Sequence, residues 1–223
     1  MTAYEFSTSL VCSEMWIRGS ILVKPPITTI TVTTSDDADT EFLLSSGRWI
    51  ELMIPTADGS HFFIASLYGY ARASGDDTVY KLNEELLARA ILRQKQMGSV
   101  PYYLCGDINV NPTSSSVIKQ AMDKRYTFDL FADLYNGAAP PTYRKGGVYA
   151  GMKGSGTTRI DAIFVNVPAG HACQQASYAY ARASAFDHVP LQLDLDVSAF
   201  HDEIKVAVQP ASVNIRSLAD LSQ

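Results

Sequence analysis

The sequence predicts a mixed α/β sandwich built as one domain. Short runs of β-branched and aromatic residues alternate with longer amphipathic runs, which indicates strands alternating with helices. Two strand-like runs are joined by an Asp-Gly turn, which favours antiparallel pairing at that place. The chain has 223 residues, 47% of them hydrophobic, and is therefore long enough to bury a sizeable core. Together these features are typical of layered folds in which helices cover sheets.

The first third of the chain predicts mainly strands. Residues 19–34 are rich in Ile, Val and Thr and predict a strand, a break at a Pro pair, and a second strand. Residues 35–39 predict a turn. Residues 48–54 and 61–68 predict two consecutive strands, and the turn at 56–60 makes them an antiparallel pair.

A helix follows, from about residue 78 to Met97, with Asp76 to Thr78 as its capping residues and Gly98 as its stop. One face of this helix is apolar and is expected to point inward. That face consists of Leu82, Leu86, Ala90 and Ile91.

The middle of the chain predicts a strand at 100–105, a loop at 106–111 and a capped helix at 114–124. Residues 129–135 predict a third, short helix. A loop rich in Gly, Pro and Thr then spans residues 137–157, and a loop of this length tends to carry function.

The last third predicts three strands, at residues 159–165, 171–181 and 189–197. Residues 201–223 are more polar and predict no regular element. No internal repeat and no apolar stretch of membrane-spanning length is visible.

Ionisable side chains occur at the ends or in the middle of three of these apolar runs. Burying a carboxylate there costs several kcal/mol unless the charge is paired, hydrogen-bonded or bound to metal, so the sequence predicts a polar site where several strands end together. Individually, Asp107 could simply stabilise a turn, and Asp187 with His188 could mark the entry to a strand. Asp161, inside Ile-Asp-Ala-Ile-Phe-Val, is the hardest to explain without a partner.

In this order and spacing, five segments resemble the endonuclease/exonuclease/phosphatase superfamily, and most closely the endonuclease domains of retrotransposons. The segments are Gly19–Val23, Ser66–Tyr70, Gly106–Asn109, Arg159–Asp161 and Asp187–His188. The resemblance implies a DNase I-like β-sandwich flanked by helices, four layers in the order α-β-β-α. The resemblance runs from about residue 19 to 197. It implies a domain at 19–200, with 1–18 as a remnant N-terminal segment and 201–223 as a C-terminal tail.

The resemblance also implies hydrolysis of phosphate esters assisted by Mg²⁺ or Mn²⁺. Asp187 would be a metal ligand, since hard cations prefer carboxylate oxygens. The other implied roles belong to the following residues: Asp161 and His188 as a carboxylate–imidazole pair, Asp107 and Asn109 beside the phosphorus, and Tyr68 as a hydroxyl donor. In the long loop, Arg144 and Lys145 are the expected contacts to a polyanion such as DNA.

The chain departs from the family pattern at its beginning. The family carries an early strand ending in Gln-Glu, and that Glu is a principal metal ligand. Only about 18 residues precede Gly19–Val23, and Glu14 lies too close to it to take that role, so we expect the first strands to be lacking. The expectation is therefore a weak nuclease, part of a longer retroelement polyprotein. Two alternatives stay open, namely a catalytically dead remnant or binding module, and a phosphatase acting on a phosphorylated small molecule or lipid.

The composition restricts the possible binding partners and cellular compartments of the protein. The formal net charge of −5 argues weakly against a generic nucleic-acid coat protein but not against an enzyme whose metal ion brings the positive charge. The three cysteines Cys12, Cys105 and Cys173 are widely spaced and predict reduced thiols. No signal peptide and no membrane segment is visible, so we expect an intracellular protein, in the cytoplasm or the nucleus.

Overall fold

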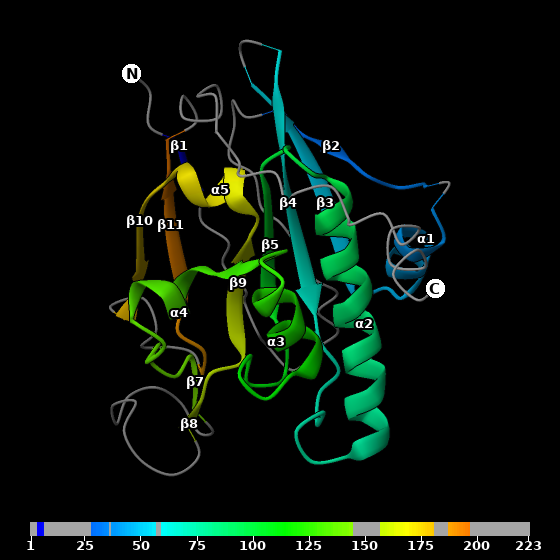
Figure 1. Ribbon diagram of the computed structural model, residues 1–223, viewed down its shortest axis with the longest axis vertical. Coiled ribbons are helices and arrows are strands. Elements are labelled where there is room, and N and C mark those ends of the chain that lie inside the picture. The colour runs from blue at the N-terminus through cyan, green and yellow to red at the C-terminus, as the bar shows by residue number, and fades with distance from the viewer. Residues whose placement is uncertain are drawn as a thin grey trace, which may run out of the picture.

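Two β-sheets lie face to face at the centre of the molecule (Figure 1). The computed structural model describes residues 4–6, 28–35, 37–56, 59–144, 157–180 and 187–196. A six-stranded sheet has the strand order β2 (Ile30–Thr31), β3 (Trp49–Pro55), β4 (His61–Tyr68), β5 (Tyr102–Asp107), β9 (Asp161–Val165) and β6 (Phe128–Asp129). A three-stranded sheet has the order β1 (Tyr4–Phe6), β11 (Leu191–Leu195) and β10 (Cys173–Tyr178).

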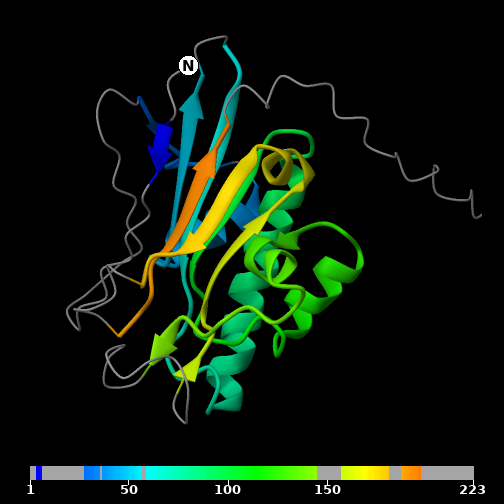
Figure 2. The same cartoon turned by 90° about the vertical axis from the view of Figure 1, so that its left-hand side faces the viewer.

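Helices cover the face of the six-stranded sheet that points away from the other sheet (Figure 2). These helices are α1 (Ala38–Ser45), α2 (Asp77–Gln96) and α3 (Ser116–Asp123). The short helices α4 (Leu130–Leu134) and α5 (Val167–His171) contact β9 and β10 instead. The predicted class, a mixed α/β fold with stacked sheets and flanking helices, is confirmed.

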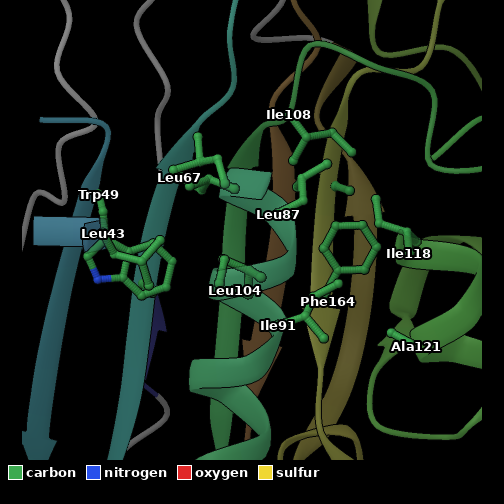
Figure 3. Packing of buried hydrophobic residues seen from close by; sticks show 14 of the residues in the cluster. Leu43, Trp49, Leu67, Leu87, Ile91, Leu104, Ile108, Ile118, Ala121 and Phe164 are labelled. Atoms are coloured by element: carbon green, nitrogen blue, oxygen red, sulfur yellow. The ribbon is translucent and has the colours of Figure 1, made fainter. Parts of the chain in front are cut away.

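Strand alternation divides the interior into two cores. Along β4, Phe63 and Leu67 face α2, whereas Phe62 and Ile64 face the three-stranded sheet. Figure 3 shows the first of these cores, in which side chains of α1, α2 and α3 meet those of β3, β4, β5 and β9. A sheet buried on both faces needs long apolar runs, which is why its central strands were visible in the sequence.

Most predicted elements are present, with shifted ends. The antiparallel pair β3–β4 is confirmed, with Trp49 opposite Leu67. The predicted helix at 78–97 is α2, and Asp76 caps it by accepting hydrogen bonds from the backbone N–H groups of Thr78 and Val79. The predicted inward position of Leu82 is wrong, because this side chain is 46% exposed.

Other expectations need correction. The turn predicted at 35–39 contains the start of α1, whose cap Asp37 accepts a hydrogen bond from the Thr40 N–H at 2.9 Å. The strand predicted at 171–181 begins only at Cys173, because α5 occupies the preceding residues. The long loop at 137–157 includes a two-stranded sheet at its ends, β7 (Tyr143–Arg144) with β8 (Thr157–Thr158).

Some expectations lie outside the described residues. They are the first strand of residues 19–34, the positions Cys12, Glu14 and Lys145, and the tail at 201–223. Strand β1, which pairs antiparallel with β11, was not expected. In the described part of the chain, no helix has both the length and the apolar composition that crossing a bilayer requires.

Candidate active site

Three polar side chains stand next to one another at the rim of the six-stranded sheet. Strand β5 lies between β4 and β9, and its last residue, Asp107, is paired with Tyr68 on one side and with Asp161 on the other. Directly paired residues point to the same face of a sheet and have Cβ atoms about 5 Å apart. This register therefore aligns a hydroxyl and two carboxylates along one edge of the sandwich.

The segment that leads into the three-stranded sheet contributes the fourth group. His188 lies just before β11, and its Nδ1 is 2.9 Å from Oδ2 of Asp161. Both side chains are buried, with 9% and 5% of their surfaces exposed. The pair thus connects the end of one sheet to the entry of the other, and the carboxylate sets the orientation of the ring.

The charges of this cluster are strongly coupled. Burial lowers the pKa of His188, but the hydrogen bond and the charge of Asp161 outweigh it and raise that pKa to about 9. Burial, together with the charges of Asp161 and Asp187, raises the pKa of Asp107. The imidazole is therefore positively charged at neutral pH, and the site still holds more carboxylates than cationic groups.

Tight backbone packing fixes the loop after β5. The backbone N–H of Asn109 donates to Oδ1 of Asp107 at 2.9 Å, and its side-chain amide donates to the carbonyl of Gly69 at 3.1 Å. A Cβ at Gly69 would lie 2.4 Å from the carbonyl oxygen of Ile108, so only glycine fits there. Asn83 of α2 closes the arrangement by donating to Ile108 and accepting from Tyr70.

These residues open onto one cleft of about 740 Å³. Of the residues predicted for the site, Tyr68, Asp107, Asn109, Asp187 and His188 line it. Asp161 is not among the lining residues and is buried behind His188. The other wall is formed by the segment after β4 and by the beginning of α2. Its residues include Arg72, Ser74, Asp76, Asp77 and Tyr80.

Of the two residues predicted to contact the substrate, the structure describes only Arg144. Arg144 lies in β7, where its backbone N–H donates to the carbonyl of Asp187 at 2.9 Å, and it is not among the residues that line the cleft. Lys145 lies outside the described residues. Arg72 lines the cleft and was not predicted, because an exposed arginine in a Gly- and Ser-containing turn carries no sequence signal.

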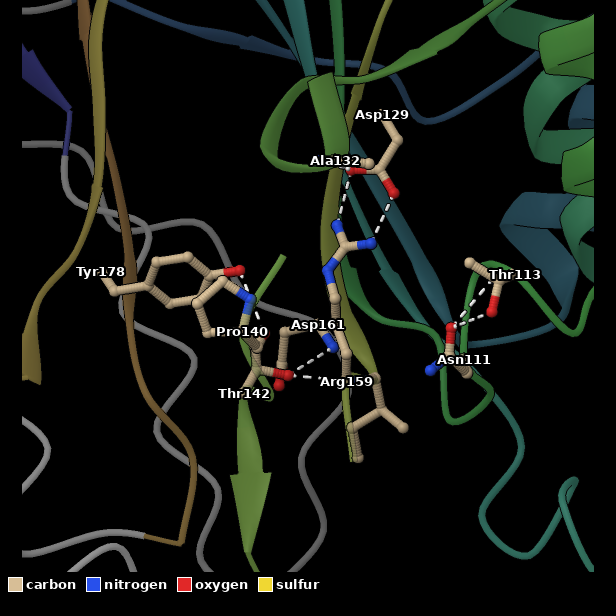
Figure 4. Close-up of polar contacts among 10 residues, drawn as sticks. Asn111, Thr113, Asp129, Ala132, Pro140, Thr142, Arg159, Asp161 and Tyr178 are labelled. Atoms are coloured by element: carbon tan, nitrogen blue, oxygen red, sulfur yellow. Dashed lines mark hydrogen bonds and ion pairs between the residues drawn. The ribbon is translucent and has the colours of Figure 1, made fainter. Parts of the chain in front are cut away.

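Arg159, the first residue of the segment that contains Asp161, forms a buried ion pair. Its guanidinium makes two hydrogen bonds to Asp129, at 2.6 and 2.5 Å, and both side chains are buried. Asp129 also caps α4 (Figure 4). The pair therefore ties the entry of β9 to α4, two positions before Asp161.

The donor set is compatible with a divalent cation. Asp107, Asp161 and His188 have ligand atoms that all lie within 4.8 Å of one another. Of this group Asp107 and His188 line the cleft, and so does Asp187, the metal ligand expected from the sequence, which is not one of the three. Surplus negative charge in a partly buried site is what a hard cation offsets.

Comparison with solved structures finds proteins of one fold. An AP endonuclease from Archaeoglobus fulgidus aligns with a TM-score of 0.52 at 17% identity, over 75% of this chain and 70% of that one. An AP endonuclease from Leishmania major gives 0.52 at 15% identity, over 67% and 54%. A mannosyl-6-phosphatase from Bacteroides thetaiotaomicron VPI-5482 gives 0.50 at 17% identity, over 66% and 56%. Neither the protein-family models nor the curated protein sequences contain a match.

The fold of this chain is therefore the one that these structures share, the DNase I-like fold expected from the sequence. The structural neighbours named above are nucleases and a phosphatase by name. The chain spans 54% of the Leishmania major enzyme and 56% of the Bacteroides phosphatase. The retrotransposon branch expected from the sequence is not confirmed by these neighbours.

Proposed function

We propose that this chain is a divalent-metal-dependent phosphoester hydrolase, and that its substrate is a phosphodiester of DNA. One observation carries the proposal. The buried pair of Asp161 and His188 meets Asp107 at the rim of the sandwich, with ligand atoms within 4.8 Å, and the rim opens onto a cleft. Convergence of buried ionisable groups in a cleft is the usual physical mark of a catalytic site.

Each side chain would have a distinct part. Asp107 would orient the attacking water and accept its proton, because it lies in the cleft next to His188. His188, held by Asp161, would donate a hydrogen bond to a non-bridging phosphate oxygen as charge develops there. Asn109 and Tyr68 would complete the contacts to the phosphate from the same side of the cleft.

Asp187, together with Asp107, would hold the cation. When bound, Mg²⁺ or Mn²⁺ would neutralise charge on the phosphate and the leaving oxygen. The backbone of Asp187 is fixed by the hydrogen bond that its carbonyl accepts from Arg144. This contact links Arg144 of β7 to the proposed metal ligand. Arg144 and Lys145 stay the contacts to DNA that the sequence predicts.

The experiment is a nicking assay on supercoiled plasmid and on an oligonucleotide with one abasic site, with and without Mg²⁺. We expect metal-dependent cleavage that falls by about 10²- to 10⁴-fold in Asp107→Asn and in His188→Ala. His171→Ala is the matched control, because that histidine is exposed at the end of α5. Cleavage that persists in both site variants would contradict the proposal. The weak activity expected from the sequence stays a prediction that the same assay measures.

A second candidate is a phosphatase acting on a small phosphorylated molecule. Two acids, Asp76 and Asp77, line the cleft as Arg72 does, and acidic side chains disfavour the repeated phosphates of a polynucleotide. Release of inorganic phosphate from a sugar phosphate and an inositol phosphate, measured beside the plasmid assay, separates the two candidates. Phosphate release without nicking would replace the first candidate by the second.

A further inference from the structure

A short segment at residues 142–144, here called the bridging segment, lies between the two parts of the chain that carry Asp161 and His188. On one side, the N–H of Thr142 donates to the carbonyl of Thr158 at 3.1 Å. On the other side, the carbonyl of Thr142 accepts from the N–H of Val189 at 2.7 Å. The bridging segment therefore makes backbone hydrogen bonds to both segments.

The side chain of Thr142 adds a second link to the first side. Its Oγ1 accepts from the backbone N–H groups of Ile160 and Asp161, at 3.1 and 3.0 Å (Figure 4). The Thr142 side chain is completely buried. A single hydroxyl thus satisfies a part-buried donor, the N–H of Ile160, and a buried donor, the N–H of Asp161, at the entry of β9, where β6 no longer pairs with the strand.

The neighbouring residue reinforces the link to His188. Tyr143 forms an isolated antiparallel bridge with His188, and the centroids of the two rings are 4.9 Å apart. The backbone of Asp161 and the backbone of His188 are therefore both fixed by adjacent residues of one segment. The distance from Nδ1 of His188 to Oδ2 of Asp161 depends on these two attachments, because Asp161 belongs to the six-stranded sheet and His188 lies outside it.

We propose that Thr142 is a positioning residue that holds Asp161 in register with His188 through its Oγ1. The position of Asp161 follows from the contacts described above. Its importance for catalysis rests on the proposed function. Removing the hydroxyl leaves the N–H groups of Ile160 and Asp161 without an acceptor, so the entry of β9 shifts to find one. The Asp161 carboxylate shifts with it, and its bond to the imidazole lengthens.

The test compares Thr142→Val, which keeps the shape and loses the hydroxyl, with Thr142→Ser, which keeps the hydroxyl. Thr127→Val is the matched control, because Thr127 is a fully buried threonine whose hydroxyl bonds to Val165 at the opposite end of β9. The primary readout is the NMR resonance of the proton on Nδ1 of His188, identified by its absence in His188→Ala. The second readout is kcat and KM for the phosphoester substrate that the wild type cleaves.

We expect Thr142→Val to shift or broaden the Nδ1 proton resonance and to lower kcat by about 10- to 100-fold, with a smaller change in KM. Thr142→Ser is expected to restore both, and Thr127→Val to leave both unchanged. If Thr142→Val does not fold, Thr142→Cys replaces it with the same expectation, because sulfur is a weaker acceptor.

A resonance and a kcat that stay at their wild-type values in the folded variant would overturn the proposal. A failure of the proposed function would look different. The wild type would then cleave no phosphoester, while the resonance of His188 would still move in Thr142→Val and return in Thr142→Ser. That result would support the positioning role and reject the hydrolase.

Discussion

At the scale of single residues, the charge balance of the cleft depends on a few side chains. Asp107 and Asp187 stand on the wall formed by the strand ends, and Asp76 and Asp77 stand on the wall formed by α2. Among the lining residues of the described chain, Arg72 is the arginine, and none is a lysine. A substrate phosphate that enters this cleft therefore has one guanidinium to contact besides the imidazolium.

Arg72 is the residue whose loss should weaken substrate binding. We expect Arg72→Asn to raise KM about 10-fold with little change in kcat, which corresponds to the loss of one charge-assisted hydrogen bond. Asn is chosen because Arg72 has a positive φ of 70°, which Asn tolerates. Arg125→Asn is the control, with φ of 56° at an exposed position outside the cleft. An equal rise of KM in both variants would show that Arg72 has no specific contact.

At the scale of elements, α2 organises the helical side of the site. Asn83 holds the loops after β4 and β5. The next residue, Glu84, accepts hydrogen bonds from the backbone N–H groups of Ser116 and Val117 at 2.9 and 3.0 Å, and from the hydroxyls of Ser115 and Ser116. A carboxylate at a helix N-terminus satisfies donors that the helix itself leaves free. Glu84 therefore caps α3 from a different helix.

Removing this cap should destabilise the protein measurably. We expect Glu84→Ala to lower the free energy of unfolding by about 1–2 kcal/mol, the usual effect of losing a helix cap. Its neighbour gives the control, because Glu85 forms an exposed pair with Arg89 and its loss should cost less than about 0.5 kcal/mol. Urea denaturation of the two variants measures the difference. Equal losses would mean that the contacts of Glu84 contribute nothing beyond those of a surface charge.

At the scale of the whole molecule, the site depends on close approach of the central strands. Gly106 of β5 lies opposite Leu67 of β4 and Ala162 of β9. A Cβ at Gly106 would lie 1.9 Å from the backbone carbonyl oxygen of Leu67, which cannot move without opening the sheet. The strand that carries Asp107 therefore reaches its position only because residue 106 has no side chain.

We expect Gly106→Ala to lower the free energy of unfolding by about 3 kcal/mol or more, or to prevent folding. Gly170→Ala in α5 is the control, because its Cβ would make an ordinary contact at 3.6 Å, and stability should stay equal or rise by up to ~1 kcal/mol. Thermal unfolding followed by circular dichroism compares the two. A Gly106→Ala variant as stable as the wild type would contradict the close packing of β4 and β5.

Much of the fold was predictable because its signals are local. The central strands are recognisable in the sequence as apolar runs. Helix α2 is recognisable by its capping residues and its apolar face. Helix α1 was missed because its short, acidic start resembles a turn. Leu82 was assigned to the wrong face because periodicity alone does not show where the sheet beneath a helix ends.

The sequence by itself determined the class of fold and the set of polar residues, because periodicity and buried charge depend on neighbours along the chain. Only the tertiary structure decided how these residues meet. The bond between Asp161 and His188 spans 27 positions, and the bonds of Thr142 to Asp161 span 19. Contacts between segments this far apart in the sequence depend on how the layers of the whole chain pack, and no pattern of neighbouring residues encodes them.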